Sequence, residues 1–345
     1  MDRDYIFKFV KQLMGIDSPT GFTKNAIDFL ESEANQMGYT TQRTNKGNLL
    51  IRISGKRHEK TVGVCAHCDT LGLMVRSIKA DGKLALTTLG SPIIPTLDSE
   101  YCRIYTRDGR VYTGTIECTS PAIHVYPDAS EKLREIDNME VRIDELVYSK
   151  EETEKLGIQN GDIIAIDTKT EITDSGFIKS RFLDDKISVA ALFGLLHEWE
   201  KKSVVPTYDT VMLISTYEEV GHGMSYLPKE ISELLAVDMG CIGLDLACNE
   251  QQVSICAKDR TGPYDYDFTT RLIELAKQNN IRYAVDIYPR YSSDVSTART
   301  GGNDIVGALV GPGVHASHGM ERTHIDGVMA TMELVQAYLI DEAKD

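Results

Sequence analysis

Three short runs of almost purely apolar residues constrain the fold of this chain more than any other feature. They span residues 61–66, 211–216 and 234–237. An apolar run without alternation is typical of a strand that is covered on both faces by helices. Helical patterns lie before and after these runs, and the segment 187–199 is the most apolar of them. The sequence therefore predicts an α/β domain with a doubly wound mixed sheet flanked by helices.

The pattern changes between residues 72 and 171. Short β-prone segments and tight turns replace helical periodicity there, and Asp81-Gly82 and Asp108-Gly109 are typical hairpin turns. A length of 345 residues also favours about two domains. We therefore predict a catalytic α/β domain made of residues 1–71 and 172–345, interrupted by an inserted β-rich domain of residues 72–171.

Charge and cysteine content limit the partners and the compartment. The chain has 37 Lys and Arg against 52 Asp and Glu, a net charge of -15 that would repel phosphate backbones, so we expect no nucleic-acid partner. No run approaches the roughly 18 apolar residues of a membrane span, and no signal-peptide core follows Met1, so we expect no membrane partner. Seven scattered cysteines fit reduced thiols. A cytoplasmic location follows as the expectation.

Histidine and acidic residues stand directly after each of the three predicted buried strands. His67 and Asp69 follow the first strand, Glu218 and Glu219 follow the second, and Asp238 follows the third. In open α/β sheets, ligands bind at the carboxyl ends of the strands. His67 and Asp69 share one face of an extended chain, which places Asp69 to orient the imidazole of His67.

Two further segments offer the same kinds of side chain. Asp184 and Asp185 precede a predicted helix, where aspartate is also an ordinary N-terminal cap. The segment 315–324 contains three histidines and ends before the last predicted helix. Imidazole and carboxylate together suit Zn, Co or Mn, so five separated segments of this kind indicate a metal site.

In order and spacing, these motifs resemble the tetrahedral dinuclear metallo-aminopeptidases of the glutamyl and leucyl aminopeptidase type, some of which are named endoglucanases. The similarity covers essentially the whole chain, including the β-rich insert. The motifs that carry it are Ala66-His67-Cys68-Asp69, Leu183-Asp184-Asp185, Glu218-Glu219-Val220-Gly221, Val237-Asp238 and His324.

The resemblance implies removal of N-terminal residues from short peptides with two divalent metal ions per subunit, Zn or Co. Asp184 would bridge the ions, Glu218 would be the general base, and Asp69 would be a second catalytic residue. The resemblance also implies a homo-oligomer, in which the insert joins dimers into a dodecamer. The implied metal ligands are His67, Asp184, Glu219, Asp238 and His324.

The chain departs from the family pattern at three places. Thr70 stands where the family usually has Glu, and Lys186 replaces a common Arg. The residues before His324 also differ from the usual approach to the last ligand, which makes His318 an alternative ligand. Two alternative functions stay open: a dinuclear deacylase or carboxypeptidase, and a metal-binding scaffold that holds peptides without cleaving them.

Overall fold

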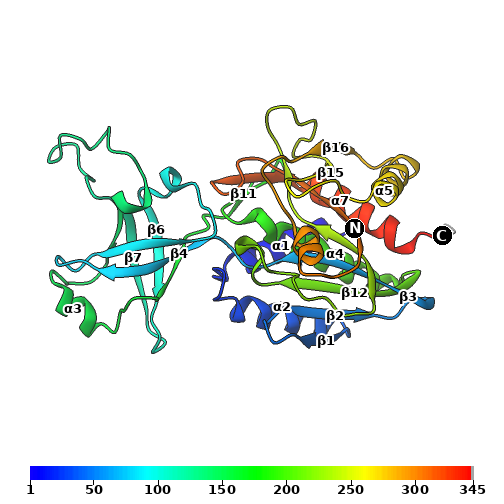
Figure 1. The fold of residues 1–345 in the computed structure, drawn as a ribbon, viewed down its shortest axis with the longest axis horizontal. Helices are drawn as coiled ribbons and strands as arrows, with labels where there is room; N and C mark the ends of the chain where they lie inside the picture. Colours follow the sequence, from blue (N-terminus) through cyan, green and yellow to red (C-terminus); the bar gives the residue numbers. More distant parts are fainter. Residues whose placement is uncertain (343–345) are drawn as a thin grey trace. The chain divides into compact units, whose positions relative to one another are not determined.

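The chain forms two compact units in the computed structural model, which describes residues 1–342. The first unit comprises Met1–Asp69 and the chain from Lys169 onward, and the second comprises Thr70–Thr168 (Figure 1). These boundaries lie two or three residues before those expected from the sequence, at 71/72 and 171/172. The second unit is thus an insertion that leaves the first after strand β3 (Arg57–His67) and returns to it before strand β10 (Glu171–Ile172).

A mixed sheet of nine strands forms the centre of the first unit. Neighbouring strands β12, β3, β13 and β17 run parallel, and antiparallel strands complete the sheet on both sides. The fold class predicted from the apolar runs is confirmed. In spatial order the strands are β1 (Thr40–Arg43), β2 (Leu49–Ile53), β12 (Tyr208–Ser215), β3 (Arg57–His67), β13 (Ile231–Val237), β17 (Val306–Val314), β15 (Val253–Lys258) and β16 (Tyr283–Ile287), with β14 (Gly240–Cys241) pairing β17.

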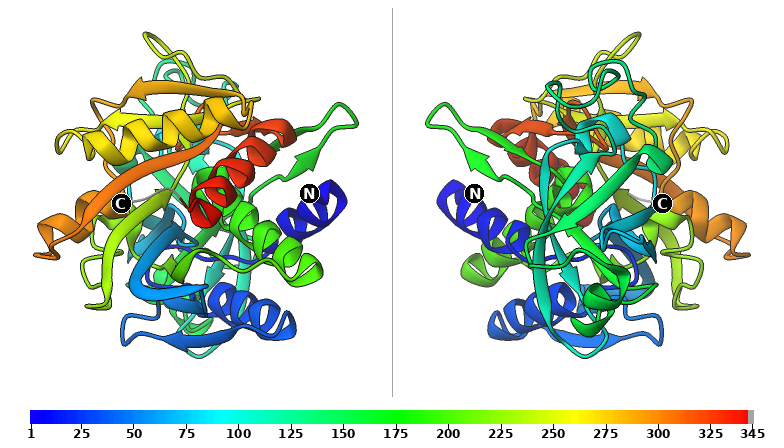
Figure 2. Two further views of the ribbon diagram at one scale, coloured as in Figure 1. Left: turned by 90° about the vertical axis from the view of Figure 1, so that its right-hand side faces the viewer. Right: turned by 90° about the vertical axis from the view of Figure 1, so that its left-hand side faces the viewer.

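Alternate side chains of the central strands pack into two separate cores, one on each face of the sheet. In β3, Val64 and Ala66 join the larger core, while Cys65 joins the other. Helices α1, α4 and α7 lie together on the larger core (Figure 2), and α6 supplies residues to the smaller one. The helices of this unit are α1 (Arg3–Met14), α2 (Lys24–Gln36), α4 (Leu183–Lys202), α5 (Tyr266–Gln278), α6 (Asp294–Thr300) and α7 (Ile325–Ile340).

The second unit is a closed antiparallel barrel with its own apolar core. Leu73, Ile104 and Ile164 are fully buried inside it. Closure pairs every strand of the barrel on both sides and leaves no open sheet edge. Its strands, in barrel order, are β4 (Gly72–Ile78), β5 (Leu84–Leu89), β8 (Met139–Ile143), β7 (Val111–Cys118), β6 (Glu100–Tyr105) and β9 (Ile163–Ile166), and a short helix α3 spans Lys150–Lys155.

A small three-stranded sheet completes the first unit beside the start of α4. It consists of β10 (Glu171–Ile172), β11 (Phe177–Ser180) and β18 (Glu321–His324). Because β11 leads directly into α4, the pairing of β11 with β18 brings residues near 320 to the start of that helix. Within residues 1–342, none of the helices has the length and apolarity that crossing a membrane requires.

Candidate active site

The parallel arrangement of the central strands brings the predicted site residues to one edge of the sheet. Ser215 at the end of β12 pairs with His67 at the end of β3. Glu218 and Glu219 follow Ser215 by three and four residues, so they lie just beyond the end of the strand that carries His67. Asp238 follows β13, the strand on the other side of β3. Asp184 enters from the first turn of α4, where the backbone at Asp184 and Asp185 is not helical. Four segments that are distant in sequence therefore meet at the carboxyl ends of neighbouring strands.

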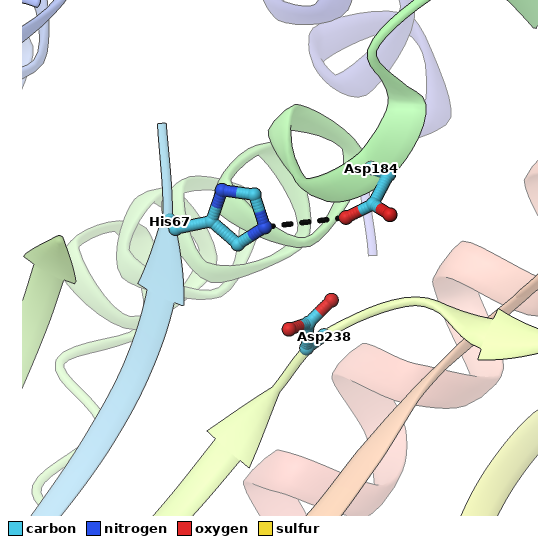
Figure 3. Close-up of side chains that lie close together, drawn as sticks. All are labelled: His67, Asp184 and Asp238. Atoms are coloured by element: carbon cyan, nitrogen blue, oxygen red, sulfur yellow. Dashed lines mark hydrogen bonds and ion pairs between the residues drawn. The ribbon is translucent and has the colours of Figure 1, made fainter. Parts of the chain in front are cut away.

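His67, Asp184 and Asp238 form what we call the first group (Figure 3). The Nε2 atom of His67 lies 3.2 Å from Oδ1 of Asp184. All three residues are buried, and one ligand atom from each lies within 4.8 Å of the others. One imidazole and two carboxylates at this spacing are a suitable ligand set for a divalent metal ion.

Asp184, Glu219 and His318 form the second group. The Nε2 atom of His318 lies 3.5 Å from Oδ2 of Asp184 and 3.7 Å from Oε2 of Glu219. Asp184 therefore directs Oδ1 towards the first group and Oδ2 towards the second. A carboxylate that offers one oxygen to each of two groups of ligands is suited to a pair of neighbouring cations.

His324, the expected last ligand, belongs to neither group, and the structure engages its ring at the start of α7 instead. Its Nδ1 atom accepts a hydrogen bond from the backbone N–H of Asp326 and caps helix α7. Its Nε2 atom lies 2.8 Å from the carbonyl oxygen of Ser175, and its ring packs edge-on against Phe177. Both ring nitrogens are thus engaged at the start of α7, and the alternative histidine, His318, stands beside Asp184.

Asp69 holds the backbone of the two glutamates that follow β12. Its carboxylate accepts hydrogen bonds from the N–H groups of Glu218 and Glu219, at 3.1 and 3.3 Å, and from the hydroxyl of Thr20 at 2.7 Å. The Nδ1 atom of His67 lies 2.9 Å from the carbonyl oxygen of Asp69 and 3.5 Å from its carboxylate. The backbone carbonyl of Asp69 thus contacts the His67 ring, and its carboxylate fixes the backbone of Glu218 and Glu219.

Burial and mutual repulsion perturb the acidic groups of the site. Burial, together with the charge of Asp184, raises the pKa of Asp238 to about 7. Burial and neighbouring carboxylates also raise the pKa of Glu218 and Glu219 well above the ordinary value. Burial opposes ionisation of Asp184 too, but hydrogen bonds with His318 and His67 outweigh it and hold the pKa of Asp184 below its usual range. Ionisation of Asp238, Glu218 and Glu219 is therefore costly where solvent does not screen their charge, and a bound cation would offset that cost.

A buried carboxylate oxygen without a hydrogen-bond partner indicates that the site can accept a cation. The Oε1 atom of Glu219 is buried and has no hydrogen-bond partner among residues 1–342. Buried carboxylate oxygens are normally hydrogen-bonded or coordinate a metal. The donor set of nitrogen and carboxylate oxygen in both groups is the chemistry that Zn and Co accept. The residues present therefore fit a pair of divalent ions.

Two positions where the sequence departs from the family pattern have plain structural roles. The fully buried ammonium of Lys186 donates hydrogen bonds to the carbonyl oxygens of Leu13 and Ile16, so it anchors the start of α4 to the end of α1. The hydroxyl of Thr70 donates to the carbonyl oxygen of Leu71. Neither side chain belongs to the two groups of ligands.

Sequence reasoning overlooked the role of two buried carboxylates beside the site. Asp294 accepts hydrogen bonds from the hydroxyl of Ser215 and the N–H of Met224, so it supports the chain on both sides of Glu218. Glu321 accepts a hydrogen bond from the N–H of Asp184 at 2.9 Å. An acidic residue three positions after His318 was the available signal for Glu321, and the acidic end of the segment 288–294 was the signal for Asp294.

Solved structures of other proteins share the fold of this chain. An aminopeptidase from the archaeon Desulfurococcus kamchatkensis is similar to this chain with a TM-score of 0.87 and 21% identity, covering 98% of this chain and 95% of that one. The TET1 peptidase of Pyrococcus horikoshii, described as able to assemble into a tetrahedron or a large octahedral shell, has a TM-score of 0.86 and 19% identity, covering 97% and 99%. The fold is therefore that of the TET aminopeptidases.

Sequence comparison then gives the family. The model of the M42 glutamyl aminopeptidase family matches residues 47–334. The Bacillus subtilis protein named "Putative aminopeptidase YhfE" is 45% identical over 333 residues, which cover 96% of each chain. The chain belongs to the M42 glutamyl aminopeptidase family, and the resemblance stated from its motifs is confirmed at that level.

Proposed function

We propose that this protein is a metal-dependent aminopeptidase that removes N-terminal residues from short peptides with two divalent ions, Zn or Co. One observation carries the proposal: the carboxylate of Asp184 directs one oxygen to each of two groups of metal ligands. Membership of an aminopeptidase family supports the substrate class. His67, Asp184 and Asp238 would hold one ion, and Asp184, Glu219 and His318 would hold the other.

Bound in these groups, divalent ions would lower the pKa of water towards neutrality and polarise the scissile carbonyl. We assign Glu218 as the acceptor of the proton of the attacking water. Two observations support the assignment: its Oε2 atom lies 3.8 Å from Nε2 of His67, and it belongs to neither group. Its raised pKa suits a carboxylate that accepts a proton and then donates it to the leaving amine. Asp69 fixes the backbone of Glu218 during both transfers.

Family membership, rather than charge, carries the choice of substrate. With two divalent ions bound, the carboxylates of Asp184, Glu218, Glu219 and Asp238 would leave little net charge at the site. A peptide N-terminus has a free α-amine, whereas an N-acyl amino acid or the C-terminus of a peptide presents no positive charge at the scissile bond. The aminopeptidase family and the aminopeptidase-named relative favour an exopeptidase that acts from the amino end.

The test is hydrolysis by the purified, metal-loaded protein of two matched panels, aminoacyl-anilides and N-acyl amino acids, with and without a chelator. We expect cleavage of the anilides alone, lost on chelation and restored by Zn²⁺ or Co²⁺. Preferential cleavage of the N-acyl compounds would instead identify a deacylase or carboxypeptidase. Peptide binding without turnover under all metal conditions would identify a non-catalytic scaffold.

We further propose a cytoplasmic homo-oligomer in which the barrel contributes the contacts between subunits. Nine of the nineteen large apolar side chains that are exposed in residues 1–342 lie in Thr70–Thr168, which is less than a third of the chain. The assemblies described for the Pyrococcus horikoshii peptidase are consistent with this arrangement. The seven cysteines, all free, fit a reducing compartment.

A further inference from the structure

The loop that carries His318 has an uncommon backbone conformation. His318 and Ala316 have φ angles of 64° and 60°, in the left-handed region that residues other than glycine rarely adopt. Such conformations persist where the surrounding structure determines them. Two buried side chains contact this loop: Arg181, whose Nη1 atom donates to the carbonyl oxygen of Gly319 at 3.3 Å, and Glu321. The position of His318 therefore depends on groups outside the two groups of ligands.

Glu321 uses both of its carboxylate oxygens on the backbone of metal-ligand candidates. Its Oε1 atom accepts a hydrogen bond from the N–H of His318, and its Oε2 atom accepts one from the N–H of Asp184, each at 2.9 Å. Only 1% of the Glu321 surface is exposed, so these bonds do not compete with solvent. A single carboxylate thus joins the residue shared by both groups to a residue that belongs only to the second group.

The small sheet explains why Glu321 reaches both partners. Ser180, at the end of β11, pairs with Glu321, the first residue of β18. Because β11 continues into Asp184 and β18 follows the His318 loop, this pairing brings both backbone N–H groups to one side chain. Residues 180–184 and 318–321 are therefore held together at the point where the second group forms.

We infer that Glu321 is a positioning residue that sets the separation between Asp184 and His318, and thereby the affinity of the second group for its metal ion. The inference rests on the proposed function, because it presumes that both groups bind metal. This role requires a carboxylate, since a glutamine side chain has one acceptor oxygen and would direct its NH₂ group at the backbone N–H of either Asp184 or His318. A buried N–H group would then lose its partner, and one of the two ligands would shift.

In the experiment, metal is first removed from the full chain with a chelator. The protein is then titrated with Co²⁺, and binding is measured by calorimetry and by the visible absorption of bound Co²⁺. Wild type is compared with Glu321→Gln and with Glu333→Gln, a control at an exposed position of α7. We expect two ions in all three proteins. In Glu321→Gln, one ion should keep its wild-type affinity and the other should bind about 10- to 100-fold more weakly, with an altered Co²⁺ spectrum.

If Glu321 had a purely structural role, Glu321→Gln would lower the melting temperature but would not make the affinities for the two ions differ. Unchanged affinities in Glu321→Gln, or an equal loss for both ions, would overturn the inference while leaving the proposed function intact. Wild-type protein that binds no Co²⁺ would instead overturn the proposed function, and this inference with it. Glu321→Ala removes both hydrogen bonds and should weaken the second ion further, and the milder glutamine variant keeps the test valid if Glu321→Ala fails to fold.

Discussion

Glu218 and Glu219 are adjacent in sequence but differ in what surrounds their carboxylates. Glu219 Oε2 lies near His318 within the second group, whereas Glu218 approaches His67 and belongs to neither group. The short 3₁₀ turn Glu218–Val220 directs the two side chains apart, and Asp69 holds both backbone N–H groups. We therefore assign a different chemical task to each: metal binding to Glu219 and proton transfer to Glu218.

The assignment of Glu218 predicts that Glu218→Gln loses activity without losing metal. An amide keeps the size and the backbone contacts of the side chain but cannot accept the proton of water. We expect kcat on an aminoacyl-anilide to fall by about 10²- to 10⁴-fold, with two ions still bound by metal analysis. Glu333→Gln serves as the control for a remote glutamate. Near-normal turnover of Glu218→Gln would contradict the base assignment.

The proposal that His318, and not His324, is the last ligand predicts opposite outcomes for two alanine variants. His318→Ala should bind one ion where wild type binds two, because it removes a ligand of the second group. His324→Ala should keep both ions but lose about 1 kcal/mol of unfolding free energy, because it removes the cap of α7. Metal analysis and urea unfolding of both variants separate these cases, and loss of an ion from His324→Ala alone would restore the original assignment.

Sequence alone could not choose between these two histidines. Both lie near the last helix, and position relative to that helix favoured His324. The choice depends on the left-handed backbone at Ala316 and His318, which turns the loop back towards Asp184. No local pattern indicates that conformation, because it is fixed by partners far away in the chain, such as Arg181. By contrast, the sequence pointed to His67 and Asp238, because His67 ends one buried strand and Asp238 directly follows another.

The close approach of β13 and β17 fixes the backbone at Asp238. The N–H of Asp238 donates to the carbonyl oxygen of Val310 at 2.9 Å. Gly311, which follows Val310 in β17, has no space for a side chain, since a Cβ atom there would lie 1.7 Å from the carbonyl oxygen of Asp238. Glycine at this position therefore permits the strand spacing that places Asp238 in the first group.

Gly311→Ala should consequently affect both stability and metal binding. The methyl group meets backbone rather than a flexible side chain, so the end of β13 must move. We expect a loss of about 1–3 kcal/mol in unfolding free energy and weaker binding of the ion held by the first group. Gly243→Ala is the matched control, because its Cβ would meet nothing within 4 Å. Equal behaviour of the two variants in urea unfolding and Co²⁺ titration would refute the argument.

The elements themselves differ in how well the sequence predicts them. The apolar runs at 61–66 and 211–216 identify β3 and β12 because both faces of these strands are buried. The small sheet of β10, β11 and β18 was not predicted. Its strands have two to four residues and no strong alternation, and the pairing of β11 with β18 joins residues about 140 apart in sequence. Only the tertiary structure reveals that contact, and with it the role of Glu321.

For the whole molecule, the buried negative charge predicts that bound metal contributes to stability. Ions that bind only the folded chain stabilise it, by about 2.7 kcal/mol for a single site at a free concentration of 100 times Kd. Chelation should therefore lower the melting temperature, and excess Zn²⁺ or Co²⁺ should restore it. The variant Asp184→Ala removes the residue shared by both groups, so its melting temperature should not respond to the chelator. A chelator effect of wild-type size in Asp184→Ala would show that stabilising ions bind elsewhere.

The distribution of exposed apolar side chains predicts which unit holds subunits together. Leu146 in the barrel and Leu244 in the catalytic unit are both almost fully exposed, at 86% and 96%. If the barrel forms the contacts between subunits, a charge at Leu146 becomes buried against a neighbour without a partner, which is costly. The same charge at Leu244 stays in water and costs little. The two leucines therefore form a matched pair for a test of assembly.

We expect Leu146→Asp to reduce the particle mass measured by light scattering, while the circular dichroism spectrum of the subunit stays unchanged. Leu244→Asp should keep the mass of wild type. The prediction concerns location as well as size, because a wild-type monomer, or equal dissociation by both variants, would contradict a barrel-mediated oligomer. If Leu146→Asp also retains two ions and full kcat on an aminoacyl-anilide, the catalytic unit works without the assembly. The barrel would then serve to gather active sites rather than to complete them.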